Sequence, residues 1–485
     1  MTPSPDPTVT LVWLRYDLRL RDHPALVDAS ERGAVVPVFI WAPGEEGAWP
    51  PGGAASWWLH HALADLDASL RDHGSRLILR TGPSLETLRD LLRTTGADRV
   101  VWNRRYHPDL TARDDAVHHA LREDGIETRV LESRLLHDPD AVETTTGGPY
   151  HVFTPFWKKV RTENLLRTGP PLDVPTLSPP DTWPDSRPLD ALGLTPEARD
   201  GTDWADGLRA AWTPTEDGAH KRIEYTLDHV LGRYDTTHDR PDVDGTSRLS
   251  PYLHHGQVSP RQVWHRVSEW ADANDAHDDA RPLLRQVVFR EFSYHWLHHY
   301  PDTPTETYRD TFADFPWRDD AEALDRWKRG QTGYPIVDAG MRQLYETGWM
   351  HNRVRMIVGS FLTKDLLLHW RHGARWFWDT LVDADLASNT FNWQWTAGSG
   401  ADAQPFFRIF NPITQSERYD PDGSYIRRFV PELSDLPTKH LHAPWDAPDR
   451  VLQNAGVTLG DTYPRPIVDH SDARDEALAA YDTIR

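Results

Sequence analysis

The feature that most constrains the fold of this 485-residue chain is a regular alternation of β-rich and helical patterns in its first 137 residues. Runs rich in β-branched residues predict strands over residues 8–15, 35–42, 76–80, 99–103 and 127–131. Apolar residues at helical spacing predict helices between them, over residues 24–32, 54–73, 84–95 and 111–124. This alternation is typical of a parallel α/β sheet with right-handed crossovers. No GxGxxG loop follows the first run, so the domain is predicted to be Rossmann-like in architecture only.

The rest of the chain follows a different pattern. From about residue 218 onward helical patterns dominate, for example over residues 260–271, 282–299, 337–347, 351–368 and 374–383. Before them, residues 168–214 hold nine prolines and little periodicity, which is typical of a long connection over the surface. We therefore predict an α/β domain (1–137), an interdomain linker (138–217) and a larger all-α domain (218–485).

Composition narrows the classes of function. The chain has no cysteine, which excludes disulfides, thiolate metal sites and cysteine-ligated iron–sulfur clusters, and no metal site is predicted. No run of 18 apolar residues appears and residues 1–7 lack a signal-peptide pattern, so we expect a cytoplasmic protein with no membrane partner. The net charge of −21 fits either a salt-loving host or an ordinary acidic protein. Any DNA-binding surface would then be a local basic patch.

Tryptophan is unusually frequent, with 22 in the chain and no internal repeat that explains them. A single tryptophan is usually core filling, but this enrichment raises the question of stacking or electron transfer. Without cysteine, any redox chemistry has to come from a bound organic cofactor or from aromatic side chains.

One candidate site is the turn Gly245-Thr246-Ser247-Arg248-Leu249-Ser250, which is rich in hydroxyl groups and precedes an apolar helix. Hydroxyls and N–H groups at a helix N-terminus suit the oxygens of a phosphate. An ordinary helix cap explains the same residues.

A second candidate lies in the predicted helix around residues 285–292. Gln286, Phe289 and Arg290 fall on one face at i, i+3, i+4 spacing. An amide, an aromatic ring and a guanidinium could together read a flipped base. The alternative is an amphipathic helix in which Arg290 pairs with a carboxylate.

A third candidate is the window from His351 to Trp376, which holds five Arg or Lys and one Asp in this acidic chain. A local basic face of this kind could follow a DNA backbone. A solvated helix face is the alternative.

The densest candidate covers residues 383–395. Asp385, Asn389 and Trp393 follow one another at i+4 spacing, so a helix would place them on one face. A carboxylate, an amide and an indole could hold the polar edge of an isoalloxazine ring. The alternative is a helix N-terminus that carries acidic residues, which is common.

These segments occur together, in this order, in photolyases and cryptochromes, and the chain resembles that family over nearly its whole length. Further matching motifs are Leu14-Arg15-Tyr16-Asp17-Leu18-Arg19-Leu20, Gly333-Tyr334-Pro335-Ile336-Val337-Asp338-Ala339-Gly340-Met341-Arg342, Trp349 to Met356, and Phe407-Arg408-Ile409-Phe410-Asn411-Pro412. On these motifs the chain is identified as a member of the family. The resemblance implies an N-terminal α/β antenna domain, a helical domain that holds FAD in a U shape, and a monomeric protein.

The resemblance also implies which residues hold FAD. The pyrophosphate and ribitol region would contact Tyr234, Thr246, Ser247, Arg248, Leu249 and Ser250. The flavin would be lined by Asn352, Arg355, Asp383, Asp385 and Asn389. The family residue that matches Asn389 faces flavin N5. An amide there is similar to photolyases, because plant cryptochromes tend to carry Asp and animal ones Cys.

Three of the tryptophans match the family's electron-transfer chain, which passes an electron from the surface to photoexcited flavin. Trp393 would lie nearest the flavin, Trp370 next and Trp317 nearest solvent. Together with Asn389, these are the residues that the resemblance implies for the redox chemistry.

The implied substrate is UV-damaged DNA with a flipped pyrimidine dimer. Trp395 would stack on the dimer, and Met356 stands where dimer-repairing enzymes carry Met. Arg353 and Arg408 would contact DNA phosphates. In the family's cycle, light reaches FADH−, one electron passes to the dimer, the cyclobutane ring splits and the electron returns. The resemblance therefore predicts a deoxyribodipyrimidine photolyase.

Two positions depart from this pattern. Dimer photolyases usually carry Glu at the position of Gln286 and Trp at that of Phe289. Gln can hydrogen-bond a base edge but cannot donate a proton or stabilise charge as Glu can, and Phe stacks with less area than Trp. Enzymes that act on the 6–4 photoproduct also carry Gln, but their characteristic His is absent where Met356 stands. A cryptochrome-like blue-light photoreceptor is the alternative function. A flavoprotein acting on a small molecule would need a nicotinamide site, which the sequence does not contain.

Within the family, Ser56-Trp57-Trp58-Leu59-His60-His61 and Asn103-Arg104-Arg105-Tyr106-His107-Pro108 are most similar to class III photolyases. Those are associated with 5,10-methenyltetrahydrofolate as antenna. Trp57 and Trp58 could stack on a pterin, and core packing explains them equally well. An 8-hydroxy-5-deazaflavin antenna, or none, stays open.

Overall fold

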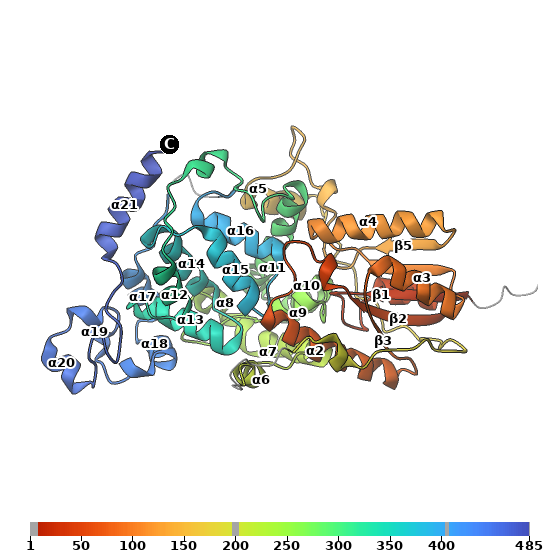
Figure 1. Ribbon diagram of the computed structural model, residues 1–485, viewed down its shortest axis with the longest axis horizontal. Coiled ribbons are helices and arrows are strands. Elements are labelled where there is room, and N and C mark those ends of the chain that lie inside the picture. The colour runs from red at the N-terminus through yellow and green to blue at the C-terminus, as the bar shows by residue number, and fades with distance from the viewer. Residues whose placement is uncertain (1–7, 196–202, 403–406, 485) are drawn as a thin grey trace, which may run out of the picture.

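The computed structural model describes residues 8–195, 203–402 and 407–484. The start of the chain (1–7) and one stretch of the predicted linker (196–202) lie outside the described residues. An α/β part lies at one end of the molecule and a larger helical part at the other (Figure 1).

The α/β part is built on one five-stranded sheet in which every pair of neighbouring strands is parallel. The strand order is β3-β2-β1-β4-β5. The strands are β1 (Thr8–Leu14), β2 (Gly33–Trp41), β3 (Ile78–Thr81), β4 (Arg99–Asn103) and β5 (Glu127–Leu131). Each of the five predicted β-rich runs overlaps one of these strands, so the predicted parallel sheet is confirmed.

Helices cover both faces of this sheet, which explains why its central strands are almost continuously buried. Alternate residues of β1 point to opposite sides. On one side Val12 packs in a cluster with residues of α1 (Pro24–Ser30) and α2 (Gly53–Asp72). On the other side Trp13 packs in a cluster with residues of α3 (Ser84–Thr95) and α4 (Pro108–Glu123).

The remainder is helical, as predicted, and all named strands of the described residues lie in the α/β part. The helices are α5 (Phe153–Thr162), α6 (Asp206–Ala211), α7 (Glu216–Tyr225), α8 (Tyr234–Thr237), α9 (Ser250–His255), α10 (Pro260–Asn274), α11 (His277–His299), α12 (Ala321–Lys328), α13 (Pro335–Thr347), α14 (Asn352–Ser360), α15 (Trp370–Thr380), α16 (Leu386–Ala397), α17 (Pro412–Tyr419), α18 (Ser424–Phe429), α19 (Thr438–Leu441), α20 (Asp449–Asn454) and α21 (His470–Asp482). None of the helices in the described ranges is both long and apolar enough to cross a membrane.

Several predicted helix boundaries are wrong, and three of the differences have a clear physical reason. Proline favours the first turn of a helix, which suggested a start at Pro282, but α11 begins five residues earlier and contains that proline. The predicted helix 351–368 is α14 followed by a π-helical turn, η7 (Phe361–Asp365), and the path turns at Leu367, whose φ is +53°. The helix predicted over 374–383 is α15, which starts at Trp370 because His369 accepts a hydrogen bond from Arg371 N and caps it.

The two parts share a continuous core and a close backbone contact. The cluster around Val12 extends to Val263 of α10 and Val288 of α11. Gly256, at φ +72°, lies so close to Tyr16 that a Cβ would stand 2.2 Å from its carbonyl oxygen. Arg19 donates to the Gly256 carbonyl at 2.8 Å. This junction fixes the helical part against the carboxyl end of β1.

The predicted linker contains structure of its own. Helix α5 packs on α11, with the rings of Phe156 and Phe292 5.1 Å apart. The proline-rich stretch runs beside the sheet, where Val35 N donates to Ser178 O at 2.9 Å.

Candidate functional site

A cavity of about 560 Å³ lies in the helical part, between α5, α11, α14 and α16. This volume suits an organic cofactor or ligand. Its wall brings together many of the residues that the sequence singled out: Gln286, Phe289, Asn352, Arg355, Met356, Asp383, Asp385, Asn389, Trp393 and Trp395.

One end of the cavity is polar and centres on Asp383. The Arg355 guanidinium contacts both oxygens of this carboxylate, at 3.1 and 2.9 Å. Ser250 donates to the same carboxylate at 2.6 Å. Through Ser250, the hydroxyl-rich turn predicted as a phosphate site is connected to the cavity wall.

Asp385 is buried and has several partners at the same end. It caps α16 by accepting a hydrogen bond from Ser388 N at 2.9 Å, as the helix N-terminus alternative anticipated. The other oxygen faces Arg134 at 3.3 Å and the hydroxyl of Tyr294. Burial alone would raise the pKa of Asp385, but the neighbouring His254 imidazole, 3.8 Å away, and the charges of Arg134 and Arg290 outweigh it. The pKa therefore lies well below its usual range, and the group is a carboxylate.

Asn389 and Trp393 follow Asp385 on successive turns of α16, as the i+4 spacing predicted. Asn389 donates from Nδ2 to Ala374 O at 3.1 Å, and its Oδ1 forms no hydrogen bond with any described residue. The orientation of the amide is thereby fixed, and an acceptor is left for a ligand in the cavity. This donor and acceptor set fits the polar edge of a flavin.

The predicted electron-transfer tryptophans come from three segments: Trp393 from α16, Trp370 from the start of α15, and Trp317 from the segment before α12. Trp393 packs against Gly373, where a Cβ would stand only 2.0 Å from its ring. Trp370 lies three residues before Gly373 and is fully buried. The His369 ring lies 5.6 Å from that of Trp370 and 5.1 Å from that of Trp317, which is partly exposed. Only Trp393 lines the cavity.

The opposite wall is less tightly bonded. Gln286 is exposed and its side chain has no hydrogen-bond partner among the described residues. The Phe289 ring packs edge-on against Phe153 and Phe391, at 4.9 and 5.5 Å. Met356 and Trp395 are both partly exposed at the same wall.

Arg290 does not share this wall, contrary to the prediction. Its guanidinium turns toward Arg134 O and Glu291 Oε1, each at 3.1 Å. A cation on the buried side of α11 requires such partners, so the carboxylate-paired alternative describes this residue.

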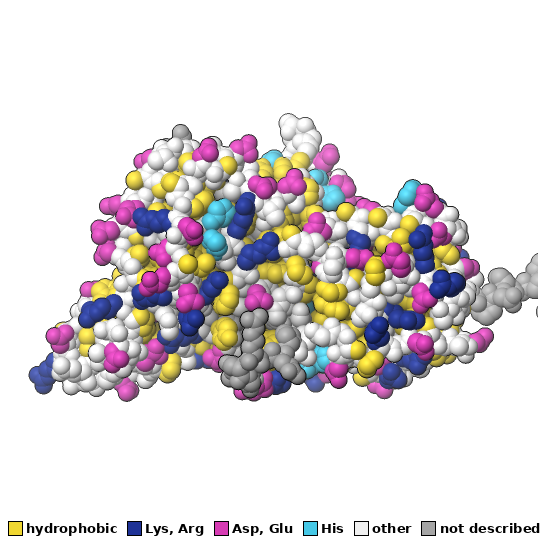
Figure 2. Space-filling model, in the orientation of Figure 1, with side chains coloured by type: hydrophobic (Ala, Val, Ile, Leu, Met, Phe, Trp, Pro, Cys, Tyr) yellow, Lys and Arg dark blue, Asp and Glu magenta, His cyan; other side chains and the backbone are white. Residues whose placement is uncertain are grey.

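The basic window does not form an open basic face either, because its cations have partners within the protein. Lys364 is fully buried and donates to Ala397 O, and burial lowers its pKa well below the usual value. Arg353 pairs with Asp239 at 2.6 Å, and Arg375 donates to Ala48 O at 2.5 Å. Figure 2 likewise shows basic and acidic side chains interspersed over the visible face.

The other predicted contact residues lie outside the cavity wall. Tyr234 is buried and stacks on His238, with ring centroids 5.1 Å apart. The carbonyls of Thr246 and Ser247 accept from Arg222, and Arg248 lies over the ring of Trp349. Leu249 is buried in the core, and Arg408 is exposed.

Sequence reasoning missed two parts of the wall. Val152, Phe153 and Thr154 belong to the predicted linker, and Asp402 accepts a hydrogen bond from Phe153 N at 3.3 Å. Burial raises the pKa of Asp402. The available signal in the sequence was the amphipathic run that begins at Phe153.

Trp57 and Trp58 offer no free face to a pterin. They are 2% and 0% exposed, and Trp58 donates to Gln257 at 2.8 Å while it stacks on His255. Core packing is therefore the correct interpretation of this pair.

The sequence and the fold match known proteins over nearly the whole length of this chain. Residues 10–178 match the family profile "DNA photolyase", and residues 283–483 match "FAD binding domain of DNA photolyase". The chain is 50% identical to a deoxyribodipyrimidine photo-lyase of Agrobacterium fabrum, covering 98% of both chains. It is 40% identical to cryptochrome-2 of Arabidopsis thaliana, covering 98% of this chain and 79% of the relative. A class III photolyase structure from Agrobacterium tumefaciens superposes with a TM-score of 0.95 at 49% identity, covering 100% of this chain and 99% of that one.

Proposed function

Because this chain belongs to the photolyase/cryptochrome family, we propose that it repairs cyclobutane pyrimidine dimers in DNA by light-driven electron transfer. The observation that carries the proposal is one cavity of about 560 Å³ whose wall combines a fixed polar end with an aromatic, weakly bonded end. The first suits a flavin, and the second suits a flipped pyrimidine dimer.

FAD, when bound, supplies the light-absorbing electron donor. The chain's own residues would hold it at the polar end of the cavity. Arg355 and Asp383 form an ion pair along which the ring would lie, and Asn389 presents a fixed amide. Because Asp385 and its partners are buried, this end is ordered before any ligand arrives, which lowers the entropy cost of binding.

Trp393, Trp370 and Trp317 would carry an electron inward from the surface to restore the reduced cofactor. Each indole is held by packing rather than by a hydrogen bond to a charged group. The Nε1 atoms of Trp317 and Trp370 are buried and have no hydrogen-bond partner among the described residues. An indole in such surroundings can be oxidised transiently without disturbing a polar network.

The substrate would enter at the aromatic end of the cavity. Trp395 and Phe289 would stack on the flipped dimer, with Met356 beside it and Gln286 hydrogen-bonding a base edge. A dimer pairs and stacks poorly in duplex DNA, so flipping it costs less than flipping an intact base. This difference would give selectivity for damage.

For the antenna we propose 5,10-methenyltetrahydrofolate, bound away from Trp57 and Trp58. Ligands of open α/β sheets bind where the strand order reverses, which here is between β1 and β4. That crevice, lined by Arg15, Asp17 and Asn103 among others, encloses only about 20 Å³, room for about one water. Neither a folate nor a deazaflavin fits in that volume, so the crevice does not choose between them, and the proposal of a folate is supported by the similarity to a class III photolyase. Acid release and mass spectrometry of the purified protein's chromophores would identify it. We further propose a cytoplasmic monomer.

The test of the proposed function is light-dependent repair by the photoreduced holoprotein. An oligonucleotide with one thymine cyclobutane dimer would be illuminated with blue light, beside a dark sample and a 6–4 photoproduct substrate. Restoration of intact thymines only in the illuminated dimer sample supports repair. Absence of repair in a protein that binds FAD and photoreduces normally would assign it to the photoreceptor class.

A further inference from the structure

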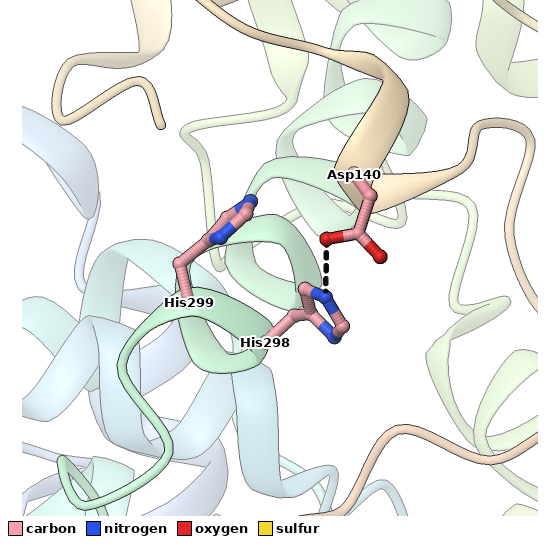
Figure 3. A group of neighbouring side chains, drawn as sticks. All are labelled: Asp140, His298 and His299. Carbon is pink, nitrogen blue, oxygen red and sulfur yellow. Dashed lines mark hydrogen bonds and ion pairs between the residues drawn. The ribbon is translucent and has the colours of Figure 1, made fainter. Parts of the chain in front are cut away.

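Three side chains that the repair reaction does not use converge where the segment after β5 meets the C-terminal end of α11. They are Asp140, in the 3₁₀ turn η2 (Pro139–Ala141), and His298 and His299 of α11 (Figure 3). One ligand atom of each lies within 4.8 Å of those of the other two. Among the residues that the structure describes, this is the one group of three His, Asp or Glu side chains that meets this criterion.

We propose that this trio, Asp140, His298 and His299, binds a divalent first-row transition metal of the Zn²⁺ type. Two imidazoles and a carboxylate are ligands that zinc and its neighbours prefer, whereas Mg²⁺ and Ca²⁺ prefer oxygen alone. Three protein ligands leave a fourth position for water.

The geometry is close to that of a metal site. Bonds of about 2.0–2.2 Å to a tetrahedral ion place its ligand atoms roughly 3.3–3.5 Å apart. His298 Nε2 and Asp140 Oδ1 are already 2.8 Å apart. Asp140 is exposed, and both histidines are partly exposed, so small side-chain rotations can bring the third ligand into range.

His299 also has an outer contact of the kind that ligating histidines make. Its Nε2 lies 3.3 Å from Pro139 O, to which it can donate its N–H. A histidine that donates one N–H to a backbone carbonyl keeps its other nitrogen unprotonated and its ring oriented, as metal-bound imidazoles do. The ring further packs against His295, with centroids 4.6 Å apart.

A metal here would join two segments that are far apart in the sequence. It would fasten η2, which follows the last strand of the sheet, to the helix whose other half carries Gln286 and Phe289. Cross-links that close long loops restrict the unfolded chain most, so binding should raise thermal stability.

The experiment is equilibrium dialysis of the FAD-loaded protein against low-micromolar Zn²⁺, followed by metal analysis. Wild-type protein is compared with Asp140→Asn, His298→Ala and a matched control, His119→Ala. His119 is exposed and pairs with Glu123 at 3.2 Å, but among the described residues it belongs to no group of three ligand side chains. The flavin spectrum of each variant reports that it is folded.

We expect the wild type and His119→Ala to retain one more Zn²⁺ per chain than Asp140→Asn and His298→Ala. Zn²⁺ should also raise the thermal midpoint of the wild type and of His119→Ala, and should leave that of Asp140→Asn and His298→Ala unchanged. Equal zinc content in all four proteins, or an equal thermal shift, would overturn the proposal. Asp140 is mostly exposed, so the conservative Asp140→Asn change gives a folded test even if His298→Ala does not.

Discussion

The two ends of the cavity are built on different principles. At the polar end Asp383 and Asp385 are 8% and 7% exposed, and each carboxylate has two or more partners. At the aromatic end Gln286 is exposed and has no partner, and Trp395 is partly exposed. Buried charges have to be paired for the chain to fold, whereas exposed side chains do not. The polar end is therefore fixed by folding, and the aromatic end is free to change with the substrate.

This difference explains why the departures from the family pattern occur where they do. Gln286 and Phe289 both lie at the aromatic end, where a substitution disturbs no pair of buried charges. Their effect should appear in substrate handling and not in cofactor binding or stability.

The largest expected effect is at Trp393, which borders the polar end. Trp393→Phe should abolish photoreduction of bound FAD, because phenylalanine is much harder to oxidise than tryptophan. The measurement is the rate of flavin bleaching under blue light with an external reductant. Trp102→Phe, a buried tryptophan of the sheet, is the control and should photoreduce normally. Equal rates in both variants would remove Trp393 from the pathway.

Asp383→Asn tests whether the polar end of the cavity holds FAD. The change leaves Arg355 without its counter-charge and weakens the contact from Ser250. Because the Arg355 side chain is 23% exposed, solvent offsets part of the loss. We expect FAD affinity to fall on the order of tenfold, or about 1.4 kcal/mol. Fluorescence titration of apoprotein with FAD measures it, and unchanged affinity would place the flavin elsewhere.

At the aromatic end, Trp395→Ala should weaken binding of a dimer-containing oligonucleotide and leave FAD content unchanged. Loss of one stacking platform costs about 1–3 kcal/mol, which is roughly 5- to 150-fold in affinity. Trp183→Ala, a partly exposed tryptophan beside Arg76, is the matched control. Equal dimer affinities for the two variants would argue against stacking on Trp395.

The buried imidazole of His351, which caps α14, makes the stability of the protein depend on pH. Burial lowers the pKa of His351 to about 4. As the pH falls, the His351 imidazole is therefore protonated in the unfolded chain before it is protonated in the folded protein. The contribution of neutral His351 to the free energy of unfolding is complete above about pH 6.5. Between that pH and pH 4 the free energy of unfolding falls by about 1.4 kcal/mol per pH unit.

The variant His351→Asn removes the titration but keeps a capping side chain at the start of α14. Its thermal midpoint should fall less between pH 7 and pH 5 than that of the wild type. An identical fall in both proteins would assign the acid sensitivity to other groups.

The smallest effect is expected from restoring the usual family residues. Gln286→Glu together with Phe289→Trp should raise the repair rate by roughly two- to fivefold, since an added carboxyl and a larger ring contribute about 0.5–1 kcal/mol. FAD affinity should not change. A change in FAD affinity would show that the two ends are not independent.

Much of this organisation could be predicted from the sequence. Residues 99–103 and 127–131 are predicted as strands with their observed bounds, because short runs that contain β-branched residues and are bounded by turns are typical of strands. The i+4 spacing of Asp385, Asn389 and Trp393 correctly placed them along one helix. Local periodicity is sufficient for such features.

Other features depend on contacts between distant segments and could not be predicted. Arg353 looks like a free cation in the sequence, but Asp239, 114 residues away, pairs with it. Lys364 is buried by packing that periodicity does not reveal. Arg134 and Tyr294, which hold Asp385, come from the end of the predicted α/β domain and from α11. These partners are set by the tertiary fold and leave no local pattern.

The most direct test of the central claim measures FAD content and dimer affinity on the same preparations of Asp383→Asn and Trp395→Ala. The account predicts that Asp383→Asn loses FAD, and that Trp395→Ala keeps full FAD while losing dimer affinity. A Trp395→Ala protein that loses FAD but binds the dimer normally would contradict the assignment of the two ends.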